Sequence, residues 1–238
     1  MLPIRDDNPT VRSTVLNWAI IAVTVAVYLL VQPRSEGELA SFLYAEATIP
    51  CEVLTAEPLS IPEIEQGTCG RGGDPLFAEK PIWWSLVASI FFHGGLFHLV
   101  GNLWMLWIFG NNIEDELGHV RYLVFYLVSG VLASLAHVAL NPRSTIPLVG
   151  ASGAIAAVMG AYLVLHPRAR VTSIIPPLFF LPFRVPAAVF LVLWFVGQFA
   201  IDTSTGVAWE AHVGGFAVGA AYAWRLRRAG RLERQIPT

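Results

Sequence analysis

Four polar side chains in this sequence have the chemistry needed for acyl transfer: Ser152, His212, His98 and Asn102. A serine hydroxyl is a weak nucleophile until a base removes its proton, and histidine suits that role because it titrates near neutral pH. The tetrahedral intermediate carries an oxyanion, which needs hydrogen-bond donors placed in advance. The residue types therefore indicate Ser152 as nucleophile and His212 as general base. His98 and Asn102, with the backbone N–H of Ser152, are candidate oxyanion donors.

The composition is that of a membrane protein. Of the 238 residues, 55% are hydrophobic and only 13% are charged. A soluble domain of this size could not bury so much apolar surface, so the long apolar runs indicate a polytopic membrane protein. The net charge of -2 gives no basic field, which excludes a nucleic-acid partner. We predict an all-α fold class, a bundle of six transmembrane helices.

Prolines, glycines and charged residues set the ends of the predicted spans. Pro142 and Pro167, for example, each stop an apolar run, because proline disfavours helix at the preceding residue. The predicted spans are approximately 14–32, 95–112, 122–140, 149–165, 186–201 and 210–224. The broken apolar stretch 85–92 is interpreted as an interfacial or re-entrant piece, and the proline-punctuated stretch 168–184 as a loop.

The basic residues predict the orientation. With the N-terminus inside, eleven arginines lie on the inner side, whereas the outer loops hold only Arg34, Arg71, Lys80 and Arg143. This positive-inside bias places both termini in the cytoplasm. We expect a multi-pass protein of a bacterial inner or plasma membrane. Its parts are a cytoplasmic N-terminus (1–13), a membrane domain (14–228) with an outer first loop (33–82), and a basic cytoplasmic tail (229–238).

The outer first loop contains both cysteines of the chain, Cys51 and Cys69. An extracytoplasmic location permits a disulfide between them. Spacing alone does not distinguish a disulfide from two free thiols, so both interpretations stay open.

The predicted topology puts the polar candidates at one depth, near the outer surface. Ser152, His212 and the pair His98 and Asn102 each fall within a turn or two of the outer end of their span. Small-residue stripes follow Ser152 and His212 and would let two helices approach closely. A third member is not evident, because Asp202 precedes the last helix by a loop and Glu210 faces away from His212. We predict a Ser–His dyad.

These motifs resemble the rhomboid family of intramembrane serine proteases. The resemblance covers about 92–223 and rests on four motifs in order. They are HGGLFHLVGNLW at 93–104, the glycines and glutamate of 110–118, GASG at 150–153, and AHVGGFAVG at 211–219. Each motif is weak alone, but all four in this order on six spans are specific.

The resemblance implies cleavage of a peptide bond in or near a substrate's transmembrane segment. The same four residues carry the chemistry, no cofactor or metal is needed, and the partners are membrane-protein substrates with a transmembrane helix and the lipid bilayer. It also implies that the first loop sits partly in the membrane. The helix at 186–201 is expected to move aside for substrate, with Trp194, Phe195 and Phe199 as a gate.

Two positions depart from the family pattern. Many relatives carry an aromatic residue one turn after the serine, packed on the base histidine, whereas this chain has Ala156. Either another aromatic residue replaces it, with Phe216 and Trp104 as the candidates, or the histidine is less firmly held. A Trp-Arg pair that anchors the first loop in many relatives is also missing, and the Trp83-Trp84 pair stands in that region instead.

Two other classes of function compete with a protease. A catalytically silent relative would bind membrane helices without cutting them, but such relatives typically lack the serine or the histidine. A small transporter would show acidic residues within its spans, and these spans hold essentially none.

A metal site from His93 and His98 is disfavoured because their spacing puts them on different helix faces.

Overall fold

The computed structural model describes residues 1–175, 179–200 and 206–232, which are mostly helical. In chain order the elements are β1 (Leu2–Asp6), α1 (Val15–Leu30), α2 (Glu36–Glu46), α3 (Pro50–Thr55), α4 (Ile61–Gln66), α5 (Ile82–Ala88), α6 (Leu96–Leu117), α7 (His119–Leu140), α8 (Ser152–Leu165), β2 (Arg170–Ile175), β3 (Phe179–Pro186), α9 (Ala187–Gln198) and α10 (Trp209–Arg228).

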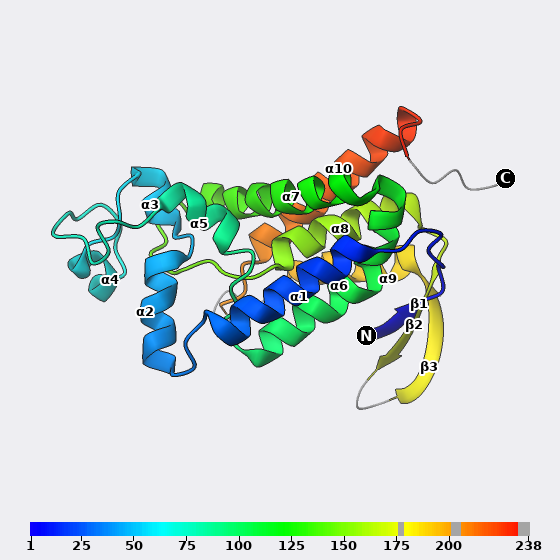
Figure 1. Ribbon diagram of the computed structural model, residues 1–238, viewed down its shortest axis with the longest axis horizontal. Helices are drawn as coiled ribbons and strands as arrows, with labels where there is room; N and C mark the ends of the chain where they lie inside the picture. The colour runs from blue at the N-terminus through cyan, green and yellow to red at the C-terminus, as the bar shows by residue number, and fades with distance from the viewer. Residues whose placement is uncertain (176–178, 201–205, 233–238) are drawn as a thin grey trace.

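Helix α8 is the centre of the molecule. Every residue from Gly153 to Tyr162 is buried, because α6, α7 and α10 pack around it. Figure 1 shows the long helices lying along the long axis, with the small sheet at one end and α2, α3 and α4 at the other. A helix buried on all sides has no polar face, and the α8 sequence accordingly consists of small and apolar residues after Ser152.

Each predicted span contains a helix, with shifted boundaries. Helix α8 begins at Ser152 rather than near 149, and α6 continues to Leu117 rather than ending near 112. The predicted end of α9 at Ile201 lies outside the described residues. Among the described helices, α7 alone is both long and apolar enough to cross a bilayer, while α1, α8 and α9 are apolar but shorter.

The all-α prediction needs a correction, because three strands form an antiparallel sheet in the order β1-β2-β3. Strand β2 lies in the stretch that was predicted to be a loop, and it is rich in the β-branched residues that suit a central strand. The prolines of the sheet stand on the two edge strands, where a missing N–H is tolerated. The pairing of Leu2 with Ile174 joins distant parts of the chain, so no local pattern reveals it.

The acidic run 114–116 near the end of α6 forms hydrogen bonds with the backbone at the N-terminus of α1. Glu114 accepts hydrogen bonds from the backbone N–H groups of Leu16 (2.9 Å) and Asn17 (2.7 Å). Asp115 accepts from those of Val11 and Arg12, each at 2.9 Å. These N–H groups have no partner within α1, and a carboxylate there also complements the helix dipole. The acidic run is therefore buried inside α6, which continues to Leu117 instead of ending near residue 112 as predicted.

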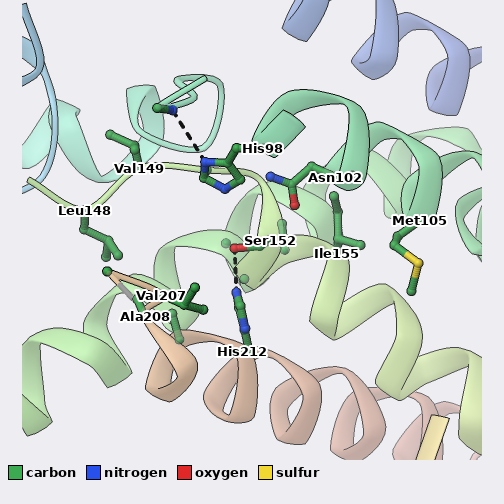
Figure 2. A pocket seen from close by; sticks show the side chains of 18 of the residues that line it. His98, Asn102, Met105, Leu148, Val149, Ser152, Ile155, Val207, Ala208 and His212 are labelled. Atoms are coloured by element: carbon green, nitrogen blue, oxygen red, sulfur yellow. Dashed lines mark hydrogen bonds between the residues drawn. The ribbon is translucent and has the colours of Figure 1, made fainter. Parts of the chain in front are cut away.

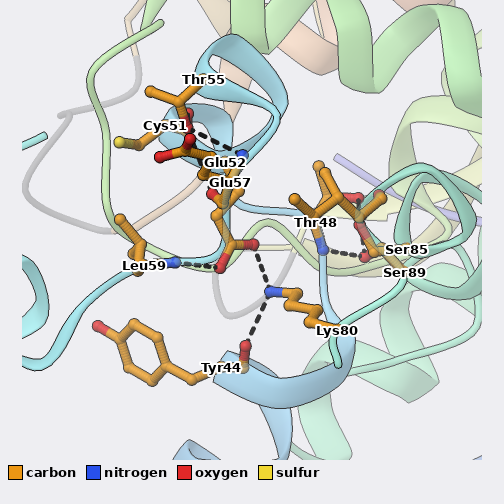
Figure 3. A network of polar contacts seen from close by, with 11 residues as sticks. Tyr44, Thr48, Cys51, Glu52, Thr55, Glu57, Leu59, Lys80, Ser85 and Ser89 are labelled. Atoms are coloured by element: carbon orange, nitrogen blue, oxygen red, sulfur yellow. Dashed lines mark hydrogen bonds and ion pairs between the residues drawn. The ribbon is translucent and has the colours of Figure 1, made fainter. Parts of the chain in front are cut away.

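The segment 33–82 is an ordered cap at one end of the bundle. It contains α2, α3 and α4, and a disulfide joins Cys51 to Cys69, which decides between the two interpretations left open by the sequence. Beside the disulfide, Lys80 and Glu52 form a buried ion pair at 2.6 Å, as Figure 3 shows. Lys80 also donates to the carbonyl of Tyr44, and Glu52 accepts from the backbone N–H of Leu59.

Desolvation dominates the energetics of this ion pair. Burial raises the pKa of Glu52 and lowers the pKa of Lys80, so the low-dielectric surroundings outweigh the mutual attraction in both groups. A buried pair of this kind contributes little net stability when intact, but it is costly to break, because one charge is then left buried alone. Loss of either partner is therefore expected to destabilise the cap.

The cap is joined to the strand-like stretch that leads into α8. Thr48 pairs with Leu148 as an isolated β-bridge, and the backbone N–H of Cys51 donates to the carbonyl of Ser144 at 3.0 Å. Ser89 accepts from the backbone N–H of Thr48 through its hydroxyl, and through its carbonyl from that of Gly150. These contacts anchor the cap without the Trp-Arg pair that the sequence lacks.

Helices α8 and α10 approach so closely that only glycine fits at three contacts. A Cβ on Gly219 would overlap the carbonyl of Ala157, one on Gly215 the carbonyl of Gly153, and one on Gly160 the backbone of Phe216. The predicted meeting of these two helices along small residues is confirmed. On α8 the closest backbone approaches to α10 are at Gly153, Ala157 and Gly160.

Replacing Gly219 by valine should destabilise the bundle by about 2 kcal/mol or more, because overpacking forces α8 and α10 apart. Gly197→Val is the matched control, since a Cβ at Gly197 in α9 meets nothing within 4 Å. Thermal unfolding in detergent measures both. Equal melting temperatures for the two variants would contradict the close contact.

Lys80→Met should cost roughly 3–5 kcal/mol, because it leaves the Glu52 carboxylate buried without a counter-charge. Adding Glu52→Gln should restore much of the loss, since no buried charge then remains. Thermal unfolding together with limited proteolysis of the segment 33–82 would measure the effect. Unchanged protease resistance in Lys80→Met alone would show that the ion pair does not hold the cap.

Candidate active site

Three helix N-termini meet at the candidate site. His98 lies in the first turn of α6, Ser152 is the first residue of α8, and His212 lies in the first turn of α10. Together with Asn102, one turn further along α6, they line a single cavity of about 740 Å³. The structure thus brings all four predicted residues together (Figure 2).

Ser152 and His212 are in direct contact. The Oγ atom of Ser152 lies 2.8 Å from Nε2 of His212, a normal hydrogen-bond distance between a hydroxyl and an imidazole. The close approach of α8 and α10 produces this distance, because Gly215, one turn after His212, packs on the carbonyl of Gly153. The geometry permits transfer of the serine proton to the histidine.

Two donors face the space beside Ser152. The amide nitrogen of Asn102 is buried and has no hydrogen-bond partner among the described residues, which is an unusual state for a buried donor. His98 accepts at Nδ1 from the backbone N–H of Gly94 at 3.4 Å, which in the neutral ring leaves the proton on Nε2. Figure 2 shows both side chains on one side of Ser152, with His212 on the other.

Gly150 makes room for His98. Its φ of 122° lies in the region that favours glycine, and a Cβ there would come within 2.8 Å of the His98 Nε2 atom. Gly150, two residues before Ser152, therefore serves both the turn that leads into α8 and the placement of the imidazole.

Gln198, at the end of α9, is a contact that the sequence analysis missed. Its Oε1 atom lies 2.7 Å from Nδ1 of His212, and the residue is only 6% exposed. The available signal was a glutamine in an otherwise apolar helix, four residues after Trp194. The serine and histidine thus have a third polar partner, although it is not a carboxylate.

The aromatic residue beside His212 is Trp194. The ring centroid of Trp194 lies 5.9 Å from that of His212. The ring of Phe216 stacks on Trp194, with 6.1 Å between the two centroids. The expectation that Phe216 or Trp104 would take this place is wrong. Trp104 instead donates from its indole N–H to the carbonyl of Pro3.

The acidic candidates do not reach His212 in the described structure. Glu210 instead bonds to His137 of α7 (3.1 Å) and to Asn141 just after that helix (3.0 Å). Asp202 lies outside the described residues. Within the described ranges, no three His, Cys, Asp or Glu side chains gather closely enough to hold a metal ion.

Comparison with known proteins identifies the family. A model of the rhomboid domain matches residues 80–229. Rhomboid protein 1 of yeast mitochondria is 30% identical over 160 residues, which are 63% of this chain and 44% of that protein. The rhomboid protease GluP of Bacillus subtilis is 30% identical over 156 residues, 65% of this chain and 28% of the relative.

A third relative is the human mitochondrial presenilin-associated rhomboid-like protein, which is 30% identical over 155 residues, 61% of this chain and 38% of that protein. The chain spans less than half the length of these curated relatives. The matched region includes the cavity and every residue that lines it. The chain is therefore a member of the rhomboid family, whose proteins reside in membranes.

Proposed function

We propose that this chain is an intramembrane serine endopeptidase that cleaves transmembrane segments of other membrane proteins. The observation that carries the proposal is the 2.8 Å contact between Ser152 Oγ and His212 Nε2, in a cavity that also holds the unpartnered amide of Asn102. A packing serine would need neither a base nor an unsatisfied donor beside it. Membership of a family that includes named proteases agrees with this assignment.

In the first step, Ser152 Oγ attacks the carbonyl carbon of the scissile bond while His212 Nε2 takes the hydroxyl proton. The electrons of the carbonyl π bond move to its oxygen. His98 Nε2–H, Asn102 Nδ2–H and the backbone N–H of Ser152 stabilise that oxyanion. The first N–H groups of α8 lack intrahelical partners, so the helix terminus adds positive potential there.

In the second step, the protonated His212 gives its proton to the leaving amine, and the C–N bond breaks to leave an acyl ester on Ser152. His212 then takes a proton from water, which attacks the ester through a second oxyanion in the same site. The ester bond breaks, and Ser152 regains its proton from His212.

We also propose a placement of the chain in the membrane. We assign α1, α6, α7, α8, α9 and α10 as six spans of the inner or plasma membrane. Both termini then lie in the cytoplasm. Under this assignment 1–13 and 229–238 are cytoplasmic, 14–228 is the membrane domain, and 33–82 is the outer cap. The 14 residues of α8 reach only ~21 Å, less than the ~30 Å hydrocarbon thickness. This length supports a serine that sits below the outer surface.

Substrate entry past α9 fits the packing. This helix contacts α8 and α10 much less extensively than α8 and α10 contact each other. Its aromatic residues Trp194, Phe195 and Phe199 form a cluster with Phe216 and Trp209 next to the cavity. Movement of α9 would open the cavity sideways to a transmembrane segment, so these three residues form the proposed gate.

The proposal is tested with purified chain in detergent and a model transmembrane substrate that has a small residue near its outer end. Wild type should cut the substrate and label with a fluorophosphonate, because both reactions need an activated serine. Ser152→Ala and His212→Ala should lose cleavage by roughly 10³-fold or more. Product bands and in-gel fluorescence provide the readouts.

The outcomes separate the alternatives. Folded wild type that neither cuts nor labels would favour a catalytically silent protein that only binds membrane helices. Cleavage that persists in Ser152→Ala would refute the assigned nucleophile.

Asn102→Ala should lower kcat by about 10²–10³-fold with little change in KM, because the amide is needed mainly once the oxyanion forms. His98→Ala should act on kcat in the same way. Steady-state kinetics on the model substrate would separate the two constants. A rise in KM with unchanged kcat would instead assign these side chains to substrate binding.

A further inference from the structure

The second ring nitrogen of His212 is held by α9, not by α8 or α10. Gln198 Oε1 lies 2.7 Å from Nδ1, while Nε2 on the opposite side of the ring faces Ser152 Oγ at 2.8 Å. The glutamine, histidine and serine therefore form a continuous line of hydrogen bonds. Membership of the rhomboid family does not by itself give Gln198 a role. Its position at Nδ1 of His212 is that of the third group in a catalytic triad, which orients the histidine.

A second hydrogen bond fixes which end of the glutamine amide faces the histidine. Gln198 Nε2 donates to the carbonyl of Trp194 at 3.0 Å. Reversing the amide would set its oxygen against that carbonyl oxygen, which repels it. The amide oxygen therefore faces His212, and because this oxygen only accepts, the neutral imidazole carries its proton on Nδ1. The lone pair on Nε2 is then left for the serine proton.

Other groups near His212 do not perform this task in the described structure. Glu210 is turned away to His137 and Asn141. Trp194, one turn before Gln198 on the same face of α9, packs its ring on His212 and offers no acceptor to Nδ1. A single helix thus supplies both the ring contact and the hydrogen bond that orient the base.

We propose that Gln198 is a positioning residue that holds His212 in the tautomer with the proton on Nδ1 and the lone pair toward Ser152. The inference rests on the proposed protease function. A neutral amide suits this depth, because a carboxylate would have to bury a full charge in the membrane. The arrangement also links α9 to the chemistry, since displacement of α9 removes both contacts from the histidine.

The direct test is NMR of protein labelled with ¹⁵N-histidine in detergent micelles. The two neutral tautomers of histidine have distinct nitrogen shifts, and comparison with His212→Ala assigns the signals. Wild-type His212 should be in the Nδ1–H form, whereas Gln198→Met should populate both tautomers. Methionine has similar length but only a weak acceptor. A wild-type His212 with its proton on Nε2 would overturn the inference whatever the variant does.

The kinetic test is the rate at which a fluorophosphonate labels Ser152. Gln198→Met should label at least about tenfold more slowly than wild type, because part of the histidine is in the wrong tautomer. Val196→Met is the matched control, since this α9 residue is 57% exposed and does not line the cavity. It should label like wild type, and melting temperatures check that both variants are folded.

The two proposals fail in different ways. Wild type that does not label would contradict the protease function, while the tautomer of His212 would still test the role of Gln198. Wild type and Gln198→Met that label equally fast, with the same tautomer, would leave the protease intact and refute the positioning role.

Discussion

The contact between the backbones of α8 and α10 is the constraint on which the rest of the structure depends. Gly160, Gly215 and Gly219 let each helix pack on carbonyl groups of the other, and any side chain there would separate them. In a membrane such packing replaces the hydrophobic drive that water supplies elsewhere. The 2.8 Å distance between Ser152 and His212 follows directly from it, because each residue stands beside one of these contacts.

Helix ends rather than helix middles form the candidate site. The first turns of α6, α8 and α10 meet at the cavity, so backbone N–H groups without intrahelical partners lie near the serine. This arrangement also explains how buried polar side chains are tolerated. The His212 imidazole is bonded on both sides, and the Asn102 amide, whose nitrogen has no partner among the described residues, lines the cavity.

The surrounding elements hold this centre in place at both ends. The carboxylates of Glu114 and Asp115 bind backbone N–H groups at and before the start of α1, and β1 pairs with β2 at the same end of the molecule. At the other end, the disulfide and the pair of Lys80 with Glu52 stiffen the cap, which bonds to the stretch before α8. Helix α9 is the lightly packed element, yet it is bonded to His212 through Gln198.

The sequence by itself predicted the helical core and four of the polar residues that line the cavity, Ser152, His212, His98 and Asn102. It could do so because residue types, apolar runs and glycine stripes are local signals. It also placed α8 beside α10. The tertiary structure decided the sheet, since the paired residues Leu2 and Ile174 lie far apart in the sequence. It decided the disulfide, the contact of Trp194 with His212, and the start of α8 at Ser152. Gln198 belongs to the same group, because an amide acquires a role only when folding brings a partner to its oxygen.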